Sequence, residues 1–139
     1  STASFVDSFR VAAAEGDARD VKFNSDGIKM FILGRGKDKV YAYSLSTGFD
    51  VSTASSVNNF SVATQEGAAN DLEFNTDGTK MFVLGQNGND VNEYTLTTGF
   101  DVSTAKYAGD DGYNYWIQRT NRESGAAKVF IMRGKDFKK

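Results

Sequence analysis

The chain of 139 residues contains no histidine, no cysteine and no proline. Without cysteine it has no disulfide framework, no thiol nucleophile and no thiolate metal site. Without histidine it lacks the imidazole of a Ser-His-Asp triad and the usual ligand of zinc and haem. An enzyme of this composition would have to work with carboxylates, lysine, tyrosine or the backbone, so much of the familiar enzyme chemistry is excluded.

Long hydrophobic runs are also missing. No stretch reaches the roughly 18 consecutive apolar residues of a membrane-spanning helix. The start of the chain, STASFVDSF, has no apolar signal-peptide core. We therefore expect no membrane partner. The serine at position 1 is typical of a chain made in the cytoplasm that has lost its initiator methionine, and equally of a fragment cut from a longer chain.

The formal net charge is only −2, but the charges are unevenly distributed. Residues 1–118 hold 9 Lys and Arg against 16 Asp and Glu, whereas residues 119–139 hold 7 against 2. A basic end on an acidic body is typical of a nucleic-acid tail, of two self-complementary surfaces, or simply of a solvated terminus. Because the rest of the chain is acidic, nucleic acid is not expected to be the main partner.

An internal repeat organises the chain. Residues 1–51 and 52–102 align without a gap and are identical at 29 of 51 positions. Residues 103–139 begin with another STA and contain GAAKVFIMRGKD, which echoes DGIKMFILGRGKD of the first unit. We expect a single repeat domain over residues 1–139, consisting of units 1–51 and 52–102 and a truncated, divergent third unit, 103–139. A period of this size is typical of propellers, solenoids and arrays.

Each complete unit predicts four short strands and no helix. Asp-Gly at 26–27 and at 77–78 predicts a tight hairpin turn. The apolar runs that follow these turns, 29–33 and 80–84, predict strands buried on both faces. Residues 5–12 have the pattern of an outermost strand. The sequence therefore predicts an all-β fold of four-stranded antiparallel, propeller-like blades repeated with a period of 51 residues.

The segments FNSDGIKMFILG and FNTDGTKMFVLG resemble the strand-turn-strand of YVTN- and lactonase-type β-propellers. The longer pattern, from FNTDG to FDVSTA, is similar to repeats of structural proteins of marine bacteriophages. Ser25 and Thr76 stand where the enzymes usually have proline before Asp-Gly. The resemblance covers residues 1–105 and implies a virion component, made in the host cytoplasm, such as a capsid decoration, knob or tail-associated protein. Propellers host many unrelated functions, so the repeat type alone does not specify an activity.

Two ways of closing the repeats remain open. Propellers typically have about 4–8 blades, and this chain encodes two complete units and part of a third. In the first, chains form a homo-oligomer in which the N-terminal strand of one completes the C-terminal blade of another. In the second, the three units close into a pseudo-threefold β-trefoil or prism. The blade pattern of the repeats favours the first, and the uneven charge adds support. The predicted interface residues are Phe5, Val6, Phe9, Val11, Val129, Phe130, Ile131 and Met132.

The acidic residues do not indicate an active site. Eight of them recur one repeat apart and are interpreted as turn-forming or blade-fixing groups: Glu15, Asp20, Asp26, Asp50, Glu66, Asp71, Asp77 and Asp101. The others show no paired carboxylates with a supporting base. The oxygen-rich segments 87–90 and 110–112 predict hairpin turns rather than calcium loops. No catalytic residue, cofactor or metal ligand is predicted.

One aromatic cluster, Tyr113, Tyr115 and Trp116, has no counterpart in the first two units. Such a cluster is typical of a sugar-stacking platform or an interface hot spot, and equally of a buried strand in the third blade. Two functions follow. The first is a non-enzymatic protein that assembles with itself and with other virion proteins. The alternative is a carbohydrate-binding, lectin-like propeller module whose partner is a glycan.

Overall fold

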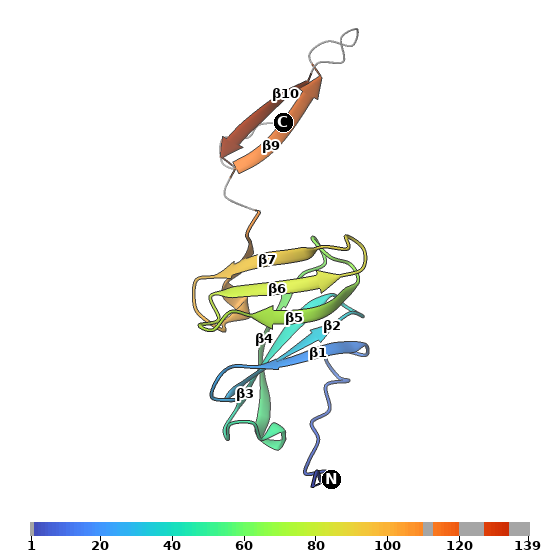
Figure 1. Ribbon diagram of the computed structural model, residues 1–139, viewed down its shortest axis with the longest axis vertical. Coiled ribbons are helices and arrows are strands. Elements are labelled where there is room, and N and C mark those ends of the chain that lie inside the picture. The colour runs from blue at the N-terminus through green and yellow to red at the C-terminus, as the bar shows by residue number, and fades with distance from the viewer. Residues whose placement is uncertain (1, 110–112, 120–126, 134–139) are drawn as a thin grey trace. The chain divides into compact units, whose positions relative to one another are not determined.

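The computed structural model describes residues 2–109, 113–119 and 127–133 (Figure 1). These residues contain ten β-strands and two short 3₁₀ helices, and none of them forms a helix long and apolar enough to cross a membrane. The chain divides into two compact units, Ser1–Tyr107 and Ala108–Lys139.

The first unit contains two four-stranded antiparallel sheets, each built from strands in chain order. Sheet 1 has the order β1-β2-β3-β4, with bounds Ala18–Phe23, Lys29–Gly34, Lys39–Leu45 and Ala54–Ser61. Sheet 2 has the order β5-β6-β7-β8, with bounds Ala69–Phe74, Lys80–Gly85, Val91–Leu96 and Ala105–Tyr107. The 3₁₀ helices η1 (Val51–Thr53) and η2 (Val102–Thr104) precede the last strand of each sheet. The prediction of an all-β protein with four-stranded antiparallel sheets is confirmed, and the described residues form no closed propeller.

The predicted Asp-Gly hairpin turns join β1 to β2 and β5 to β6. Gly27 and Gly78 have φ values of 72° and 70°, a left-handed conformation that glycine adopts without a steric cost from Cβ. Phe49 and Phe100 pack close to these glycines and also have positive φ values, 61° and 58°. Each donates its N–H to the carbonyl of the neighbouring glycine at 3.0 Å. These residues, 51 positions apart, have the same local geometry, and we call any two residues 51 positions apart counterparts.

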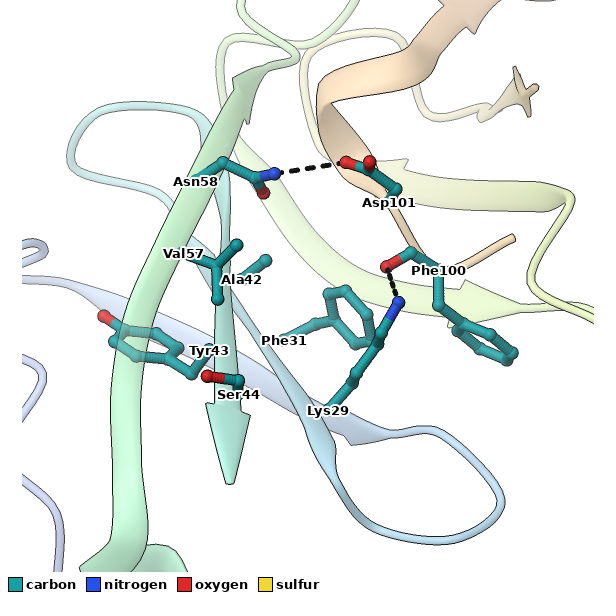
Figure 2. A pocket seen from close by; sticks show the side chains of 9 residues that line it. All are labelled: Lys29, Phe31, Ala42, Tyr43, Ser44, Val57, Asn58, Phe100 and Asp101. Atoms are coloured by element: carbon teal, nitrogen blue, oxygen red, sulfur yellow. Dashed lines mark hydrogen bonds between the residues drawn. The ribbon is translucent and has the colours of Figure 1, made fainter. Parts of the chain in front are cut away.

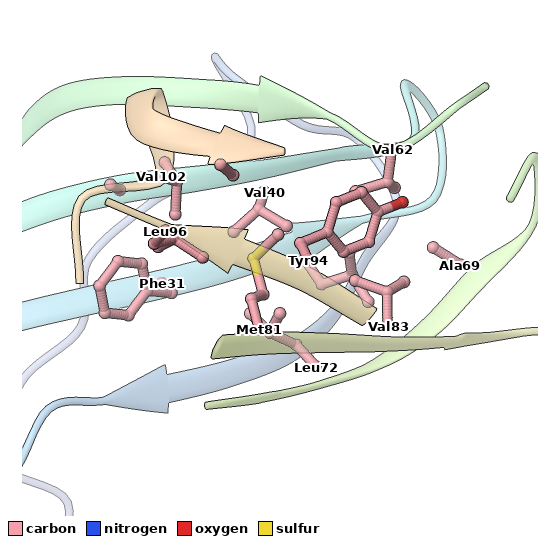
Figure 3. Packing of buried hydrophobic residues seen from close by; sticks show 13 residues of the cluster. Phe31, Val40, Val62, Ala69, Leu72, Met81, Val83, Tyr94, Leu96 and Val102 are labelled. Carbon is pink, nitrogen blue, oxygen red and sulfur yellow. The ribbon is translucent and has the colours of Figure 1, made fainter. Parts of the chain in front are cut away.

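The main core lies between the two sheets, where β1 and β2 contact β5 (Figures 1 and 3). It contains Phe31, Leu33, Val40 and Ala42 from sheet 1 together with residues of sheet 2 such as Met81. A second apolar cluster forms on another part of sheet 1: Met30, Ile32, Tyr41, Tyr43 and Leu45. Residues 9–14 supply part of the cover of this second cluster.

The predicted strand over residues 5–12 is wrong, because residues 2–11 have no regular secondary structure. The counterpart of this segment lies in β4, which pairs with β3 along Lys39–Leu45. Among the described residues, no strand pairs with residues 5–12. An apolar alternation becomes a strand only where another strand satisfies its backbone groups.

The second unit contains one antiparallel hairpin, formed by β9 (Tyr113–Arg119) and β10 (Ala127–Arg133). In its register Tyr115 lies opposite Ile131 and Trp116 opposite Phe130.

Candidate functional site

The interface between the two sheets shows in detail how this chain recognises a neighbouring sheet. Three phenyl rings form its aromatic centre. Phe31 of sheet 1 lies 4.5 Å from Phe74 and 6.1 Å from Phe100 of sheet 2, measured between ring centroids, and Phe74 lies 5.6 Å from Phe100. Aromatic pairs of this kind contribute about 0.5–1.5 kcal/mol beyond the area they bury. We call these residues the aromatic trio.

At the first strands of the two sheets, a hydrogen bond and an ion pair join β1 to β5. The Asp20 carboxylate accepts the N–H of Leu72 at 2.9 Å. Lys22 Nζ lies 3.2 Å from Glu73 Oε2. The hydrogen bond with Glu73 raises the pKa of Lys22, while the N–H of Phe74, with Lys22 as a further cause, lowers the pKa of Glu73 despite partial burial. Because these side chains are partly exposed, the ion pair specifies register more than it adds stability.

A small cavity of about 120 Å³ lies farther along the interface (Figure 2). Lys29 Nζ donates to the carbonyl of Phe100 at 3.3 Å, and Asn58 Nδ2 donates to Asp101 Oδ1 at 3.1 Å. Asn58 Oδ1 is buried and has no hydrogen-bond partner among the described residues. Since its polar side chains already bridge the sheets, the cavity belongs to the interface.

Two buried glutamates hold the loops after β2 and β6. Glu66 is 1% exposed, and its carboxylate accepts the N–H groups of Ala68, Asn87 and Gly88 at 2.7, 3.1 and 3.3 Å. Burial alone would raise the pKa of Glu66, but these three N–H groups outweigh it and hold the pKa below its usual value. Its counterpart Glu15 accepts three backbone N–H groups in the same way. Both glutamates fix loops, as their repetition in the sequence predicts.

Most of the other repeated acids also bond to backbone amides. Asp50 and Asp101 are the N-caps of η1 and η2. Asp26 and Asp77 accept the N–H two residues later in the hairpin turns. In the segment 87–90, Asn89 has a positive φ of 51° and Asp90 accepts a hydrogen bond from Asn92, so the segment forms the turn before β7. Residues 110–112 lie outside the described residues.

Sheet 2 has a face that nothing in Ser1–Tyr107 covers, and this face carries the counterparts of buried residues of sheet 1. Three apolar side chains of sheet 1 have no exposed surface: Phe31, Leu33 and Val40. Their counterparts are partly or largely exposed: Phe82, Leu84 and Val91. Leu84 is 40% exposed and Val91 62%. They line a groove of about 290 Å³ together with Lys22 and Glu73. We call this surface the sheet 2 face.

Sheet 1 has a corresponding surface on its other side, which we call the sheet 1 face. It carries Val21, 48% exposed, and Phe49, 62% exposed. Their counterparts Leu72 and Phe100 pack in the interface between the sheets. The sequence predicted burial for the run 80–84, which includes Phe82 and Leu84, and it predicted neither face as an interaction surface. Counterparts such as Phe49 and Phe100 are identical, so the sequence carries no signal of which copy is covered.

The predicted interface residues near the N-terminus do not form one surface. Phe5 and Val6 are 84% and 88% exposed. Phe9 packs edge-on against Tyr43 with ring centroids 5.2 Å apart, and Val11 packs on the same cluster of sheet 1. A contact of these residues with Val129–Met132 of another copy stays a prediction.

The predicted residues of the second unit lie in its hairpin. Tyr113, Tyr115 and Trp116 are in β9, and Val129, Phe130, Ile131 and Met132 are in β10. The structure describes the backbone of these strands, so their proposed roles in glycan binding and assembly remain predictions.

No family model and no curated protein matches the chain. Among solved structures, the fold is similar to the crystal structure of a putative 6-phosphogluconolactonase from Bacteroides fragilis NCTC 9343, with a TM-score of 0.51 and 12% sequence identity. The similarity covers 84% of this chain and 39% of that chain. That protein is of the lactonase type that the strand-turn-strand segments resemble. At this identity the two chains share a fold, and the likeness says nothing of a shared activity.

Proposed function

We propose that this chain is a non-enzymatic structural protein that assembles by completing propeller-like blades between copies of itself. The setting we propose is a virion, as a capsid decoration, knob or tail-associated protein, because of the resemblance of the longer repeat pattern to phage structural proteins. Other virion proteins are then further partners.

One observation supports self-assembly most directly. The two sheets bury a shared apolar core, yet the pair leaves large apolar side chains exposed on the sheet 1 and sheet 2 faces. Exposed apolar surface of this kind marks an interaction site on a protein in water. In a propeller, every such face is covered by the next blade.

Analytical ultracentrifugation from nanomolar to high micromolar concentration tests the proposal. We expect a native mass of at least two chains at the upper end, and dissociation on dilution. A Phe5→Ser, Val6→Ser double variant tests the predicted N-terminal contact without disturbing the fold, because both side chains are more than four-fifths exposed. Ile28→Thr, which introduces the residue of the second unit, is the matched control. A chain that stays monomeric throughout would refute self-assembly.

A lactone hydrolase is the enzymatic alternative, which the fold likeness brings into consideration. Against it, most of the repeated acids bond to backbone amides, and Lys22 and Glu73 bond to each other. Turnover of 6-phosphogluconolactone that is abolished by Glu73→Gln would overturn the non-enzymatic proposal.

Glycan binding through Tyr113, Tyr115 and Trp116 is the second alternative. Aromatic rings with a polar edge suit stacking on a sugar ring. A glycan array probed with the wild-type chain and with Trp116→Ala separates this function from assembly, because only a lectin would bind a glycan in a Trp116-dependent manner.

A further inference from the structure

We propose that copies of this chain stack head to tail, with the sheet 2 face of one copy packing against the sheet 1 face of the next. The contact would repeat the interface that joins the two sheets within the chain. This inference rests on the proposed self-assembly and names its partner surface. The partner is a second copy of this chain.

The aromatic trio supports the pairing because each face carries an incomplete version of it. On sheet 1, Phe23 and Phe49 lie 5.5 Å apart, as their counterparts Phe74 and Phe100 do at 5.6 Å. Phe74 and Phe100 have Phe31 as their third ring, whereas Phe23 and Phe49 have none in Ser1–Tyr107. The counterpart of Phe31 is Phe82, on the sheet 2 face. Stacking two copies would place Phe82 of one against the Phe23–Phe49 pair of the other.

The hollows in the surface fit the same arrangement. The cavity of about 120 Å³ is lined by Val57 and Asn58 of β4 in sheet 1 and, from sheet 2, by Phe100 and Asp101, which precede η2. Their counterparts line an open hollow of about 500 Å³ between the N-terminal segment and the start of η1: Val6, Asp7, Phe49 and Asp50. Within the chain, the interface closes the cavity with residues of sheet 1 that include Lys29. The counterpart of Lys29 is Lys80, so a second copy would close the acidic hollow with a lysine.

The charges along β1 and β5 also favour stacking sheet 2 of one copy on sheet 1 of the next. Lys22 of sheet 1 meets Glu73 of sheet 2 within the chain, and these two residues are counterparts. Stacking sheet 2 of one copy on sheet 1 of the next would again bring a glutamate to a lysine. Two copies joined through the same face would bring together like charges, which repel across an interface.

One hydrogen bond between the two sheets has a counterpart acceptor and a counterpart donor that are not bonded to each other within the chain. Asp20 accepts the N–H of Leu72 across the two sheets. The counterpart acceptor, Asp71, is exposed, and among the described residues no N–H donates to its carboxylate. The counterpart donor is the N–H of Val21, which bonds to the adjacent Asp20 Oδ1 at 2.8 Å. On stacking, this N–H would exchange that bond for one to Asp71 of the neighbouring copy.

Residues 9–14 of the N-terminal segment do not block the sheet 1 face, whereas Val6 and Asp7 lie beside Phe49 in the hollow. Phe9 packs edge-on against Tyr43, and its counterpart Phe60 packs edge-on against Tyr94 at 5.5 Å. Residues 60–65 pack on sheet 2 within the chain, and sheet 2 still packs against sheet 1. Residues 9–14 pack on sheet 1 in the corresponding position, so they leave room for sheet 2 of a neighbouring copy.

A head-to-tail contact is heterologous and closes into a ring when its rotation permits. Two copies supply four sheets, within the usual range of about 4–8 blades.

Two single variants and their mixture test the proposal. Phe82→Asp places a charge on the sheet 2 face, and Phe49→Asp places one on the sheet 1 face. Each should weaken association by at least about 30-fold, as expected for a central interface residue. Phe82→Asp keeps its sheet 1 face and Phe49→Asp keeps its sheet 2 face. An equimolar mixture should therefore form a dimer of one chain of each variant, and this dimer has no intact face left to bind a further chain. Ile28→Asp is the control, since Ile28 is 43% exposed and its counterpart Thr79 remains exposed beside the existing interface. Circular dichroism verifies that each variant is folded.

The absence of cysteine allows a second, independent readout. A Val21→Cys, Asp71→Cys double variant should form ladders with a short thiol-specific cross-linker, whereas either single variant should not. Cross-linking of Val21→Cys alone would show a contact between like faces and overturn the proposal.

The outcomes separate this inference from the proposed function. A wild-type chain that associates while Phe82→Asp and Phe49→Asp associate equally well overturns head-to-tail stacking and leaves self-assembly in place. A wild-type chain that is monomeric at all concentrations overturns both.

Discussion

At the scale of the residue, a glutamate and a glycine far apart in the sequence depend on each other. A Cβ atom on Gly85 would overlap the side chain of Glu66, and one on Gly34 would overlap Glu15. The glycine ends a strand and leaves the space in which the carboxylate reaches the next loop. The repetition of Glu and Gly in both units therefore reflects one loop-fixing device, which the sequence indicated without showing its partners.

The Glu66→Gln substitution should lower the free energy of unfolding at neutral pH by about 2 kcal/mol, because a charged acceptor of three N–H groups is replaced by a neutral one. The pKa of Glu66 in the folded state lies below the ordinary glutamate value of 4.5. Its contribution is therefore fully present above that value and declines as the pH falls towards the folded-state pKa. The difference in the free energy of unfolding between the wild type and Glu66→Gln should therefore narrow below about pH 4.

Urea denaturation at several pH values measures this gap. Glu93→Gln is the control, because Glu93 is partly exposed and pairs with Lys80 on the surface, so its replacement should cost less than about 1 kcal/mol. A gap for Glu66→Gln that stays constant with pH would contradict the assigned role of the carboxylate.

At the scale of the element, nearly identical strands have different environments. β2 reads KMFILG and β6 reads KMFVLG. In β2 all residues after the lysine are buried, whereas in β6 burial alternates with exposure. The apolar run predicted a strand buried on both faces, and this is correct for β2 alone. The difference arises because a second sheet covers β2, while nothing in Ser1–Tyr107 covers the same side of β6.

Phe31→Ala and Phe82→Ala form a matched pair of the same substitution in counterpart strands. Phe31→Ala should lower the free energy of unfolding by about 3–5 kcal/mol, since it empties the centre of the aromatic trio. Phe82→Ala should cost less than about half as much in the dilute monomer, because its ring is only partly buried. Urea denaturation at low protein concentration compares the two. Equal losses would mean that the sheet 2 face is covered within a single chain.

At the scale of the whole molecule, the described residues of both apolar clusters lie between Phe9 and Tyr107. The surfaces proposed for head-to-tail stacking lie in the same part of the chain. Of the interface residues predicted from the sequence, Val6 lines the hollow beside Phe49, and a contact through Val129–Met132 stays a prediction.

A chain truncated after Tyr107 should keep its fold and its cooperative unfolding. Circular dichroism and urea denaturation measure both. Under head-to-tail stacking, the truncated chain should also keep its association, measured by ultracentrifugation against the full-length chain. Loss of association with the fold retained would instead place the contact in the second unit, at the predicted residues Val129–Met132.

The sequence by itself determined the all-β class, the Asp-Gly turns, the four-strand units and the structural role of most of the repeated acids, because these depend on residues close along the chain or repeated in it. Only the tertiary structure decided that residues 5–12 form no strand and that Phe31 is buried while Phe82 is partly exposed. Strand pairing and burial depend on which surface lies opposite. The two repeat units share one sequence pattern, so the sequence cannot encode the different burial of Phe31 and Phe82. That difference arises because a neighbouring sheet covers Phe31 and none covers Phe82 within Ser1–Tyr107.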